Sequence, residues 1–264
     1  MLDKQLYLLQ NRTLINVTGQ DSLKFLQNLI TNDLVNLKTN LVYSALLTPQ
    51  GKYLFDFFII KKSNTFFTID ISSTSKESFL NRMQIYKLRS NIKIEEVNGR
   101  VAIGISQKPR DAFFDPRCKE LGWRQYFTGS VYPSGVTVLD KVKYDKIRIA
   151  NRIPETDIEL IKDKTYILEA GFERLSGVSF TKGCYVGQEV TARMRHKTEL
   201  QKGLVKIRII GDVNSSTHNI LYEGKNVGFV LTKVEDYAIA YLKFKYEQLT
   251  LTFGTAKVEL IQKF

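Results

Sequence analysis

The sequence has few of the residues on which metal and thiol chemistry depend. Its 264 residues include two cysteines, Cys118 and Cys184, and two histidines, His196 and His218. The cysteines form no CxxC pair, and no stretch has the ligand spacing of a zinc site. One thiolate cannot hold a [4Fe–4S] cluster, which normally takes four cysteines. We therefore predict no resident metal site in this chain.

Other absences remove whole classes of function. The sequence contains no phosphate-binding P-loop, no GxSxG turn and no HExxH motif, so kinases, hydrolases and metalloproteases lose their usual markers. No run approaches the roughly 20 apolar residues of a membrane helix. The opening Met1–Lys4 leads into no secretory signal. We expect a cytoplasmic protein with reduced thiols and no membrane partner.

Positive charge is what the sequence has in excess. The formal net charge is +12, which attracts nucleic acid, a membrane surface or an anionic small molecule. The stretch 182–208 is especially basic and carries one aromatic residue for base stacking, Tyr185. That composition favours a small anion over RNA, with a solvated face as the open alternative. The basic residues are Lys182, Arg193, Arg195, Lys197, Lys202, Lys206 and Arg208.

The pattern of helices and strands predicts an α+β body followed by a β-rich end. Strand-like runs at 42–48 and 53–60 flank a turn and form a hairpin. Thr18 is the expected N-cap of a first helix, and a later helix is expected at 140–152. The stretch 107–135 is expected to be mainly loop. Short strands after Lys202 predict a small β-barrel or sandwich, so we divide the chain into 1–106, 107–200 and 201–264.

The segment Lys182–Glu189, KGCYVGQE, is the most informative in the chain. It places Cys184 after a lysine and before a helical segment, and both features favour thiolate over thiol. Its glycines allow a sharp bend and a close approach by a ligand or partner. The alternative is that Cys184 is a small buried hydrophobe, as free cysteines often are.

This segment resembles the signature of the YgfZ family of folate-binding proteins, relatives of the glycine-cleavage T-protein, an aminomethyltransferase. The resemblance continues in order along most of the chain. It implies a folate-binding α+β body of antiparallel sheets and helices, with a C-terminal β-barrel. The other similar segments are Phe25–Leu29, Thr31–Asp33, Ser44–Lys52, Asp115–Arg117, Leu121–Gly122, Leu168–Phe172, Gly177–Phe180 and Val190–Arg193.

The resemblance implies a set of folate-binding residues. Glu169 stands where the T-protein family carries a folate-contacting glutamate, and a carboxylate can accept hydrogen bonds from two pterin N–H groups. Without the resemblance, Glu169 would be taken as a surface residue. Lys182, Tyr185, Gln188 and Arg193 complete the predicted tetrahydrofolate site.

Two residues are candidates for chemistry. Asp56 is similar to a T-protein aspartate that assists methylene transfer, but Phe55 stands where that hairpin tends to carry a further acid. Cys184 has no T-protein counterpart and points to the YgfZ branch. That branch is associated with iron–sulfur cluster maintenance and with tRNA thiolation that depends on cluster enzymes.

We expect a tetrahydrofolate-binding accessory protein that supports iron–sulfur cluster assembly or repair, and through it tRNA modification. Its expected partners are iron–sulfur proteins or their assembly machinery and a folate with one or several glutamates, with tRNA an indirect partner only. The alternatives are a folate-dependent aminomethyltransferase or other one-carbon transferase, and an RNA-binding accessory protein whose affinity would fall steeply with salt. Whether the protein is an enzyme is left open.

Overall fold

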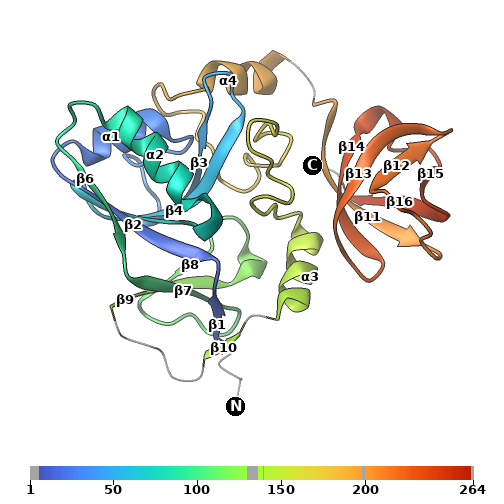
Figure 1. The fold of residues 1–264 in the computed structure, drawn as a ribbon, viewed down its shortest axis with the longest axis horizontal. Helices are drawn as coiled ribbons and strands as arrows, with labels where there is room; N and C mark the ends of the chain where they lie inside the picture. Colours follow the sequence, from blue (N-terminus) through green and yellow to red (C-terminus); the bar gives the residue numbers. More distant parts are fainter. Residues whose placement is uncertain (1–5, 130–135, 139, 198–199, 263–264) are drawn as a thin grey trace.

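The computed structural model describes residues 6–129, 136–138, 140–197 and 200–262. Two five-stranded sheets form a body, and a closed six-stranded barrel lies beside it (Figure 1). Helix α3 and the irregular segment that follows it run between the body and the barrel (Figure 1). This arrangement confirms the predicted α+β body with a C-terminal β-barrel.

The first sheet packs against a hydrophobic core on each face, the second core lying against strands β3 and β4. Its strand order is β3-β4-β5-β2-β6, and all pairs are antiparallel. Phe57 and Ile59 of β4 pack into a core with helices α1 and α2, whereas Phe58 and Ile60 face a second core. Alternation along the strand explains the division, since successive side chains point to opposite faces. The elements are β2 (Arg12–Thr18), α1 (Ser22–Leu29), β3 (Leu41–Leu47), β4 (Tyr53–Ser63), β5 (Phe66–Ser72), α2 (Lys76–Lys87) and β6 (Lys93–Val97).

The start of α1 differs from the prediction. Strand β2 continues to Thr18, and Asp21 is the N-cap residue without a side-chain capping bond. The Asp21 carboxylate instead accepts a hydrogen bond of 2.7 Å from the backbone N–H of Asn91. The predicted Thr18 cap is therefore wrong, because strand pairing uses that residue.

The second sheet corrects the prediction of a loop at 107–135. Its strand order is β10-β1-β7-β9-β8, and β8 and β9 lie inside the expected loop. The sheet takes strands from both sides of residue 106, so the parts 1–106 and 107–200 share it. The domain limits stay predictions. Its strands are β1 (Leu6–Leu9), β7 (Gly99–Gly104), β8 (Ala112–Phe114), β9 (Trp123–Thr128) and β10 (Val136–Val138).

Helix α3 (Lys141–Asn151) confirms the helix expected at 140–152. The Asp140 side chain caps it by accepting from the N–H groups of Val142 and Lys143, and Arg152 ends it. The helix contacts barrel strands β13 and β14. Helix α4 (Gln188–Lys197) then leads toward the barrel.

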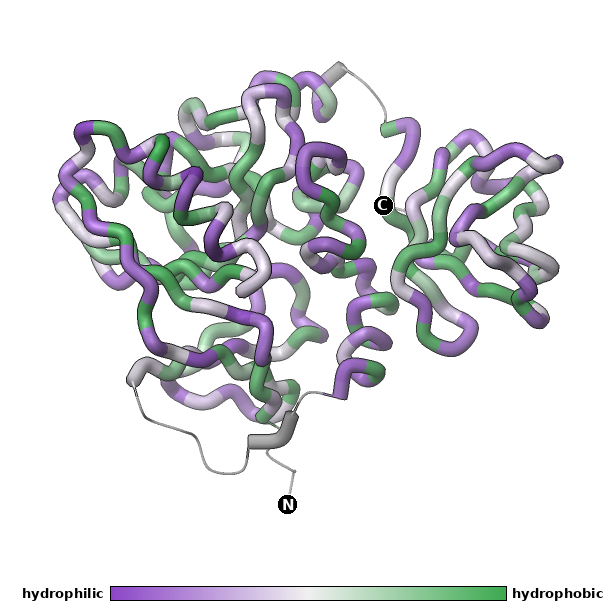
Figure 2. The backbone as a smooth tube through the Cα atoms, in the orientation of Figure 1, coloured by the Kyte–Doolittle hydropathy of each residue, from purple (hydrophilic) through white to green (hydrophobic). Residues whose placement is uncertain are grey.

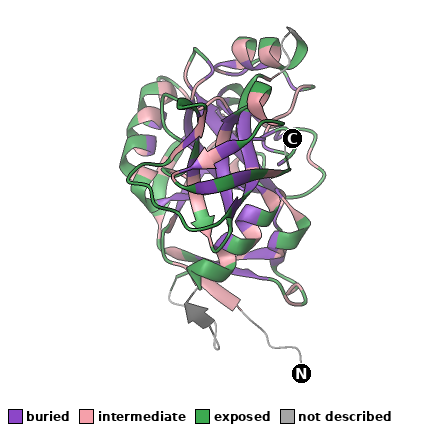
Figure 3. Ribbon diagram, turned by 90° about the vertical axis from the view of Figure 1, so that its right-hand side faces the viewer, coloured by how far each residue is buried: buried purple, intermediate pink, exposed green. Residues whose placement is uncertain are grey.

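The barrel has its own hydrophobic core. Its strand order is β11-β14-β13-β12-β15-β16. Its core residues include Val205, Ile207 and Leu242. Hydropathy alternates along several barrel strands (Figure 2), and Figure 3 shows buried residues in the strands at the centre of its view. None of the helices in the described ranges is long and apolar enough to cross a membrane. The barrel strands are β11 (Lys202–Ile210), β12 (Asn219–Tyr222), β13 (Lys225–Val234), β14 (Tyr237–Lys243), β15 (Leu251–Phe253) and β16 (Ala256–Gln262).

Candidate functional site

Lys182 anchors the signature segment to the end of helix α1. Its Nζ donates to the backbone carbonyls of Gln27, Ile30 and Asn32 at 2.6, 2.6 and 2.9 Å. A lysine ammonium has three N–H donors, so these bonds use all of them. Burial lowers the pKa of Lys182 to about 8. The predicted role of Lys182 in cofactor binding stays a prediction, although these three bonds leave the ammonium no further donor for a ligand.

Cys184 is exposed although its neighbours are fixed. Tyr185 is buried in the second core, where burial raises its pKa to about 12. Helix α4 begins four residues after the cysteine, at Gln188. Cys118, the other cysteine, is half-buried and donates from its Sγ to Glu120 Oε2 at 2.6 Å. Both thiols are free, and the structure does not support Cys184 as a small buried hydrophobe.

A second anchor follows the cysteine at Gly187. This glycine has a φ of +82°, and a Cβ atom there would lie 2.6 Å from the carbonyl oxygen of Thr48 in the β3–β4 turn. Gly51 in that turn has a φ of +75° and packs against Val190. The two segments therefore fit together only with glycine at both positions.

Gln188 and Arg193 lie on helix α4 and bond within their own segment. The Gln188 Nε2 donates to the carbonyl of Gly183 at 3.4 Å, and exposed Arg193 pairs with Glu189 at 2.7 Å. The predicted cofactor contacts of these two residues, and of buried Tyr185, stay predictions.

The basic residues of 182–208 do not converge on one groove among the described side chains. Arg195 pairs with Glu173 at 2.8 Å and lies over the Phe180 ring, while Lys206 lies over the Tyr237 ring. The side chain of Lys197 is outside the described set. The described arrangement favours a solvated face over a continuous anion groove.

Asp56 lines a polar cavity of about 200 Å³ in the body, here called the Asp56 cavity. Its carboxylate accepts hydrogen bonds from Tyr43 at 3.0 Å, Tyr53 at 2.8 Å and Thr156 at 2.6 Å. Burial, and then the Asp56 charge, raise the pKa of both tyrosines well above the usual value. Both phenols therefore remain protonated and able to donate.

The arginines of the Asp56 cavity already have carboxylate partners. Asp70 pairs with both Arg12 and Arg124 at 2.6 Å. Asp115 pairs with Arg117 at 2.9 Å. Because these cations are neutralised locally, the cavity has no concentrated positive charge left to attract an anionic tail.

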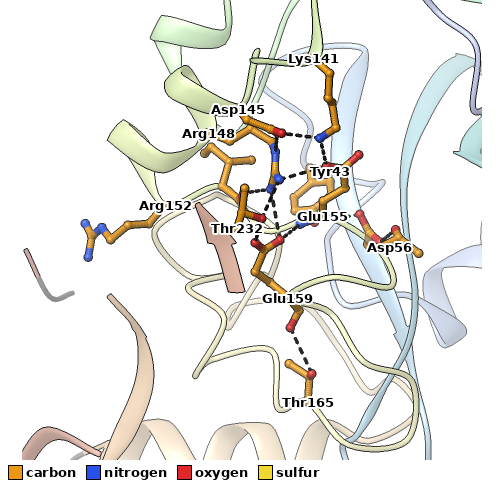
Figure 4. A network of polar contacts seen from close by, with 12 residues as sticks. Tyr43, Asp56, Lys141, Asp145, Arg148, Arg152, Glu155, Glu159, Thr165 and Thr232 are labelled. Carbon is orange, nitrogen blue, oxygen red and sulfur yellow. Dashed lines mark hydrogen bonds and ion pairs between the residues drawn. The ribbon is translucent and has the colours of Figure 1, made fainter. Parts of the chain in front are cut away.

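Arg148 and Glu159 separate the Asp56 cavity from a second cavity. Arg148 lines the first and Glu159 the second, and their side chains form an ion pair of 3.1 Å (Figure 4). Thr232 of barrel strand β13 donates to Glu159 and accepts from Arg148. The barrier between the cavities thus includes a barrel residue.

The second cavity, here called the junction cavity, lies between the body and the barrel. Its volume is about 300 Å³. Apolar side chains from both parts dominate its lining, and Lys164 and Lys202 add positive charge. The described lining residues are Ile158, Glu159, Ile161, Lys164, Thr165, Ala170, Lys202, Leu204, Phe229, Leu231 and Tyr241.

Glu169 is a lining residue of neither cavity, but it contacts Tyr241 and Lys202, which line the junction cavity. It accepts a hydrogen bond from Tyr241, and Lys202 Nζ lies 4.0 Å away. Burial raises the pKa of the Glu169 carboxyl, opposed by the Tyr241 bond and the charges of Lys202 and Lys52. The structure therefore does not bring Glu169 and Asp56 into one cavity.

Several residues of these sites were not identified from the sequence. Tyr43 had a detectable signal, because hairpin pairing of Ala45 with Asp56 places Tyr43 two residues away on the same face. No comparable sequence signal identifies Thr156, Arg148 or Tyr241, because these residues reach their partners only through tertiary packing.

Comparison with solved structures shows the same fold. The glycine cleavage system aminomethyltransferase T from Bartonella henselae superimposes with a TM-score of 0.77, covering 98% of this chain and 85% of that protein at 13% identity. At this identity the similarity concerns the fold. Residues 201–263 match the family described as "CAF17, C-terminal beta-barrel domain".

Comparison with curated proteins identifies relatives named iron–sulfur cluster assembly factor IBA57, or its homologue, mitochondrial. The protein from Mycosarcoma maydis is 28% identical over 222 residues, covering 75% of this chain and 55% of its own. The Neurospora crassa protein is 30% identical over 232 residues, covering 76% and 52%. The Mus musculus protein is 27% identical over 241 residues, covering 79% and 67%. This chain thus spans about half the length of the two fungal relatives. With the signature segment and the T-protein-like fold, these similarities show that the chain belongs to the IBA57/CAF17/YgfZ family.

Proposed function

We propose that this protein is a folate-binding accessory factor for the assembly or repair of iron–sulfur clusters, with Cys184 as its functional thiol. Iron–sulfur proteins or their assembly machinery are the proposed partners. Enzymes that modify tRNA through such clusters would be affected indirectly. The named relatives are mitochondrial, whereas we propose that this chain acts in the cytoplasm. Fractionation of cells expressing the tagged protein separates the two locations.

One observation carries the proposal: Cys184 is exposed between two fixed points. Lys182 is held by three hydrogen bonds on one side, and Tyr185 and Gly187 are packed on the other. Such anchoring reduces the conformational entropy that the loop would lose when a partner engages the thiol. This geometry suits a thiol presented to another protein.

A single exposed thiol favours transfer or repair of an iron–sulfur cluster over storage of one. An iron–sulfur cluster normally takes four cysteine ligands, so Cys184 would supply one and a partner the others. No group of three or more metal-binding side chains occurs in the described part of the chain. Disulfide exchange with a partner is the second reaction open to the same thiol.

The junction cavity has the chemistry that a folate needs. Phe229, Leu231 and Tyr241 offer apolar surface for a flat ring, and the Glu169 carboxylate accepts a hydrogen bond from Tyr241. Lys164 and Lys202 line the same cavity and could receive a carboxylate tail. Ligand cavities are typically apolar with a few placed polar groups, as here, whereas most residues that line the Asp56 cavity are polar or charged. Bound tetrahydrofolate would supply a carrier for one-carbon units.

One observation favours an aminomethyltransferase or other one-carbon transferase as the second candidate. The Asp56 carboxylate is held by three hydroxyl donors at the edge of a cavity, as a positioned catalytic carboxylate would be. A transferase would need Asp56 for turnover and would not need Cys184. The two candidates therefore make opposite predictions for the same pair of variants.

Complementation tests the proposal directly. In cells lacking the native copy, Cys184→Ala should fail to restore the activity of [4Fe–4S] enzymes, and Cys118→Ala should restore it. Asp56→Asn separates the candidates, because only the transferase requires that carboxylate. Full rescue by Cys184→Ala at equal protein level would contradict the thiol role.

Calorimetric titration with tetrahydrofolate tests the ligand. The wild type should bind, and Glu169→Ala should weaken binding about tenfold or more, which corresponds to loss of a charge-assisted hydrogen bond. Absence of binding to the wild type would remove folate from the proposal and leave the Cys184 experiment to decide the rest.

A further inference from the structure

Arg152 adopts a backbone conformation that disfavours an arginine. It ends helix α3 with φ 49° and ψ 48°, in the left-handed region. Residues with a Cβ are strained there, and helices commonly use glycine at this point. A side chain that persists at this position needs a compensating interaction.

The guanidinium of Arg152 lacks that compensation within the protein. The residue is 4% exposed, and its Nε and Nη1 are buried without a hydrogen-bond partner. In Figure 4 the side chain points away from the Arg148 network, and no dashed line reaches it. A buried charge normally requires a partner. Arg117, Arg124 and Arg148 are buried too, and each pairs with a carboxylate.

A second arginine lies beside it. Arg174 Nη2 donates to the backbone carbonyl of Arg152 at 2.9 Å. Although Arg174 as a residue is exposed, burial and then the charge of Arg152 lower the pKa of its guanidinium to about 10. Neither arginine forms an ion pair with a carboxylate within the described ranges. Cys118 interacts electrostatically with Arg174, but the nearby Glu120 carboxylate accepts a hydrogen bond from the Cys118 thiol and pairs with neither arginine among the described residues.

We propose that Arg152 and Arg174 form a binding site for a small oxyanion, a phosphate or a carboxylate, that enters past the exposed Arg174. A planar guanidinium presents paired N–H donors that match two oxygens of either group. The anion would neutralise the buried charge and relieve the repulsion between the arginines. This site is separate from both cavities described above and does not depend on the proposed function.

Thermal unfolding in phosphate tests the site. Sodium phosphate should raise the Tm of the wild type above its value in sodium chloride of equal ionic strength, because a ligand that binds the folded state stabilises it. The same titration with succinate shows whether a carboxylate serves as well. Arg174→Gln should weaken the binding about tenfold or more, the factor that corresponds to one charge-assisted hydrogen bond.

Arg152→Asn gives two independent readouts. Asparagine tolerates the left-handed conformation and removes the buried charge, so in chloride this variant should have a higher Tm than the wild type. It should also lose the response to phosphate. Arg110→Gln, which removes an exposed arginine elsewhere, is the matched control and should keep the response.

Three results would overturn the site. One is a wild-type Tm that responds to neither phosphate nor succinate beyond chloride. Another is a phosphate response that survives Arg152→Asn. The third is a Tm of Arg152→Asn in chloride below that of Arg110→Gln, which would show that Arg152 stabilises the fold without an anion.

Discussion

The Nζ of Lys182 donates a hydrogen bond of 2.6 Å to the backbone carbonyl of Ile30, 152 residues earlier in the chain. Ile30 is the C-cap of helix α1, where carbonyls lack helical partners and cations are favourable. The signature lysine thus joins two segments that the sequence keeps far apart. Its contribution is first of all structural, and the segment that presents Cys184 depends on it.

Replacing this lysine should destabilise the protein. Lys182→Met removes the donor of one buried and two half-buried carbonyls, and we expect the free energy of unfolding to fall by about 2–4 kcal/mol. Urea unfolding at pH 7 measures the change. Lys24→Met, on an exposed position of α1, is a matched control and should change stability by less than about 0.5 kcal/mol. Equal effects of the two substitutions would contradict the anchoring role.

The Lys182 anchor should also be visible in the pH dependence of stability. The pKa of Lys182 is about 8 in the folded protein, below the usual value of about 10.4. The unfolded chain therefore binds more protons between these values, and Lys182 makes stability rise with pH across that window. The difference between wild type and Lys182→Met, measured by urea unfolding from pH 7 to 10, should grow accordingly. A constant difference would show that the ammonium keeps its ordinary pKa.

The two glycines of the signature segment should respond differently to alanine. Gly187→Ala places a Cβ 2.6 Å from the Thr48 carbonyl at a φ of +82°, so we expect a loss of about 1–3 kcal/mol in stability. Gly183→Ala meets no described atom within 4 Å and should change stability by less than about 0.5 kcal/mol. Thermal or urea unfolding compares the two variants. The prediction fails if Gly183→Ala is the more damaging.

The two cysteines should differ in reactivity. Cys184 is exposed, whereas Cys118 is half-buried, and burial together with the bond to Glu120 raises the pKa of its thiol. Limited iodoacetamide should therefore label Cys184 first, as peptide mass spectrometry can show. Cys184→Ser should abolish the fast phase of labelling. A fast phase that remains in this variant would assign it to Cys118.

Glu169 should make stability depend on acid conditions. Burial raises the pKa of its carboxyl, so the folded protein holds this proton more tightly than the unfolded chain. The resulting stabilisation is present below the ordinary pKa of about 4.3 and is lost as pH rises through the folded value. Glu169→Gln, which stays neutral, should therefore gain stability relative to wild type between pH 4 and 7. Thermal unfolding of both proteins across this range measures the trend, and an opposite trend would show that the carboxylate form is favoured.

Local patterns predicted the elements whose formation depends on neighbouring residues. The β3–β4 hairpin and most barrel strands follow from alternation and turn residues, and α3 lies within the helix expected at 140–152. The two incorrect predictions, the Thr18 cap and the loop at 107–135, failed because of contacts between distant segments. Pairing with β5 extends β2 through Thr18, so that residue cannot cap the first helix. Strands β8 and β9 form because β9 pairs with β7 on one side and with β8 on the other.

The sequence by itself determined the family, the α+β body with its barrel, and the segment that carries the exposed thiol. These follow from motif order and hydrophobic periodicity, which are local properties of the chain. The tertiary structure decided which polar groups meet. It placed Lys182 on the end of α1, Glu169 beside Tyr241 of the barrel, and Asp56 in a cavity that Glu169 does not line. The physical reason is that each of these contacts depends on a hydrogen bond or ion pair between distant segments, and only packing of the cores brings such groups within reach.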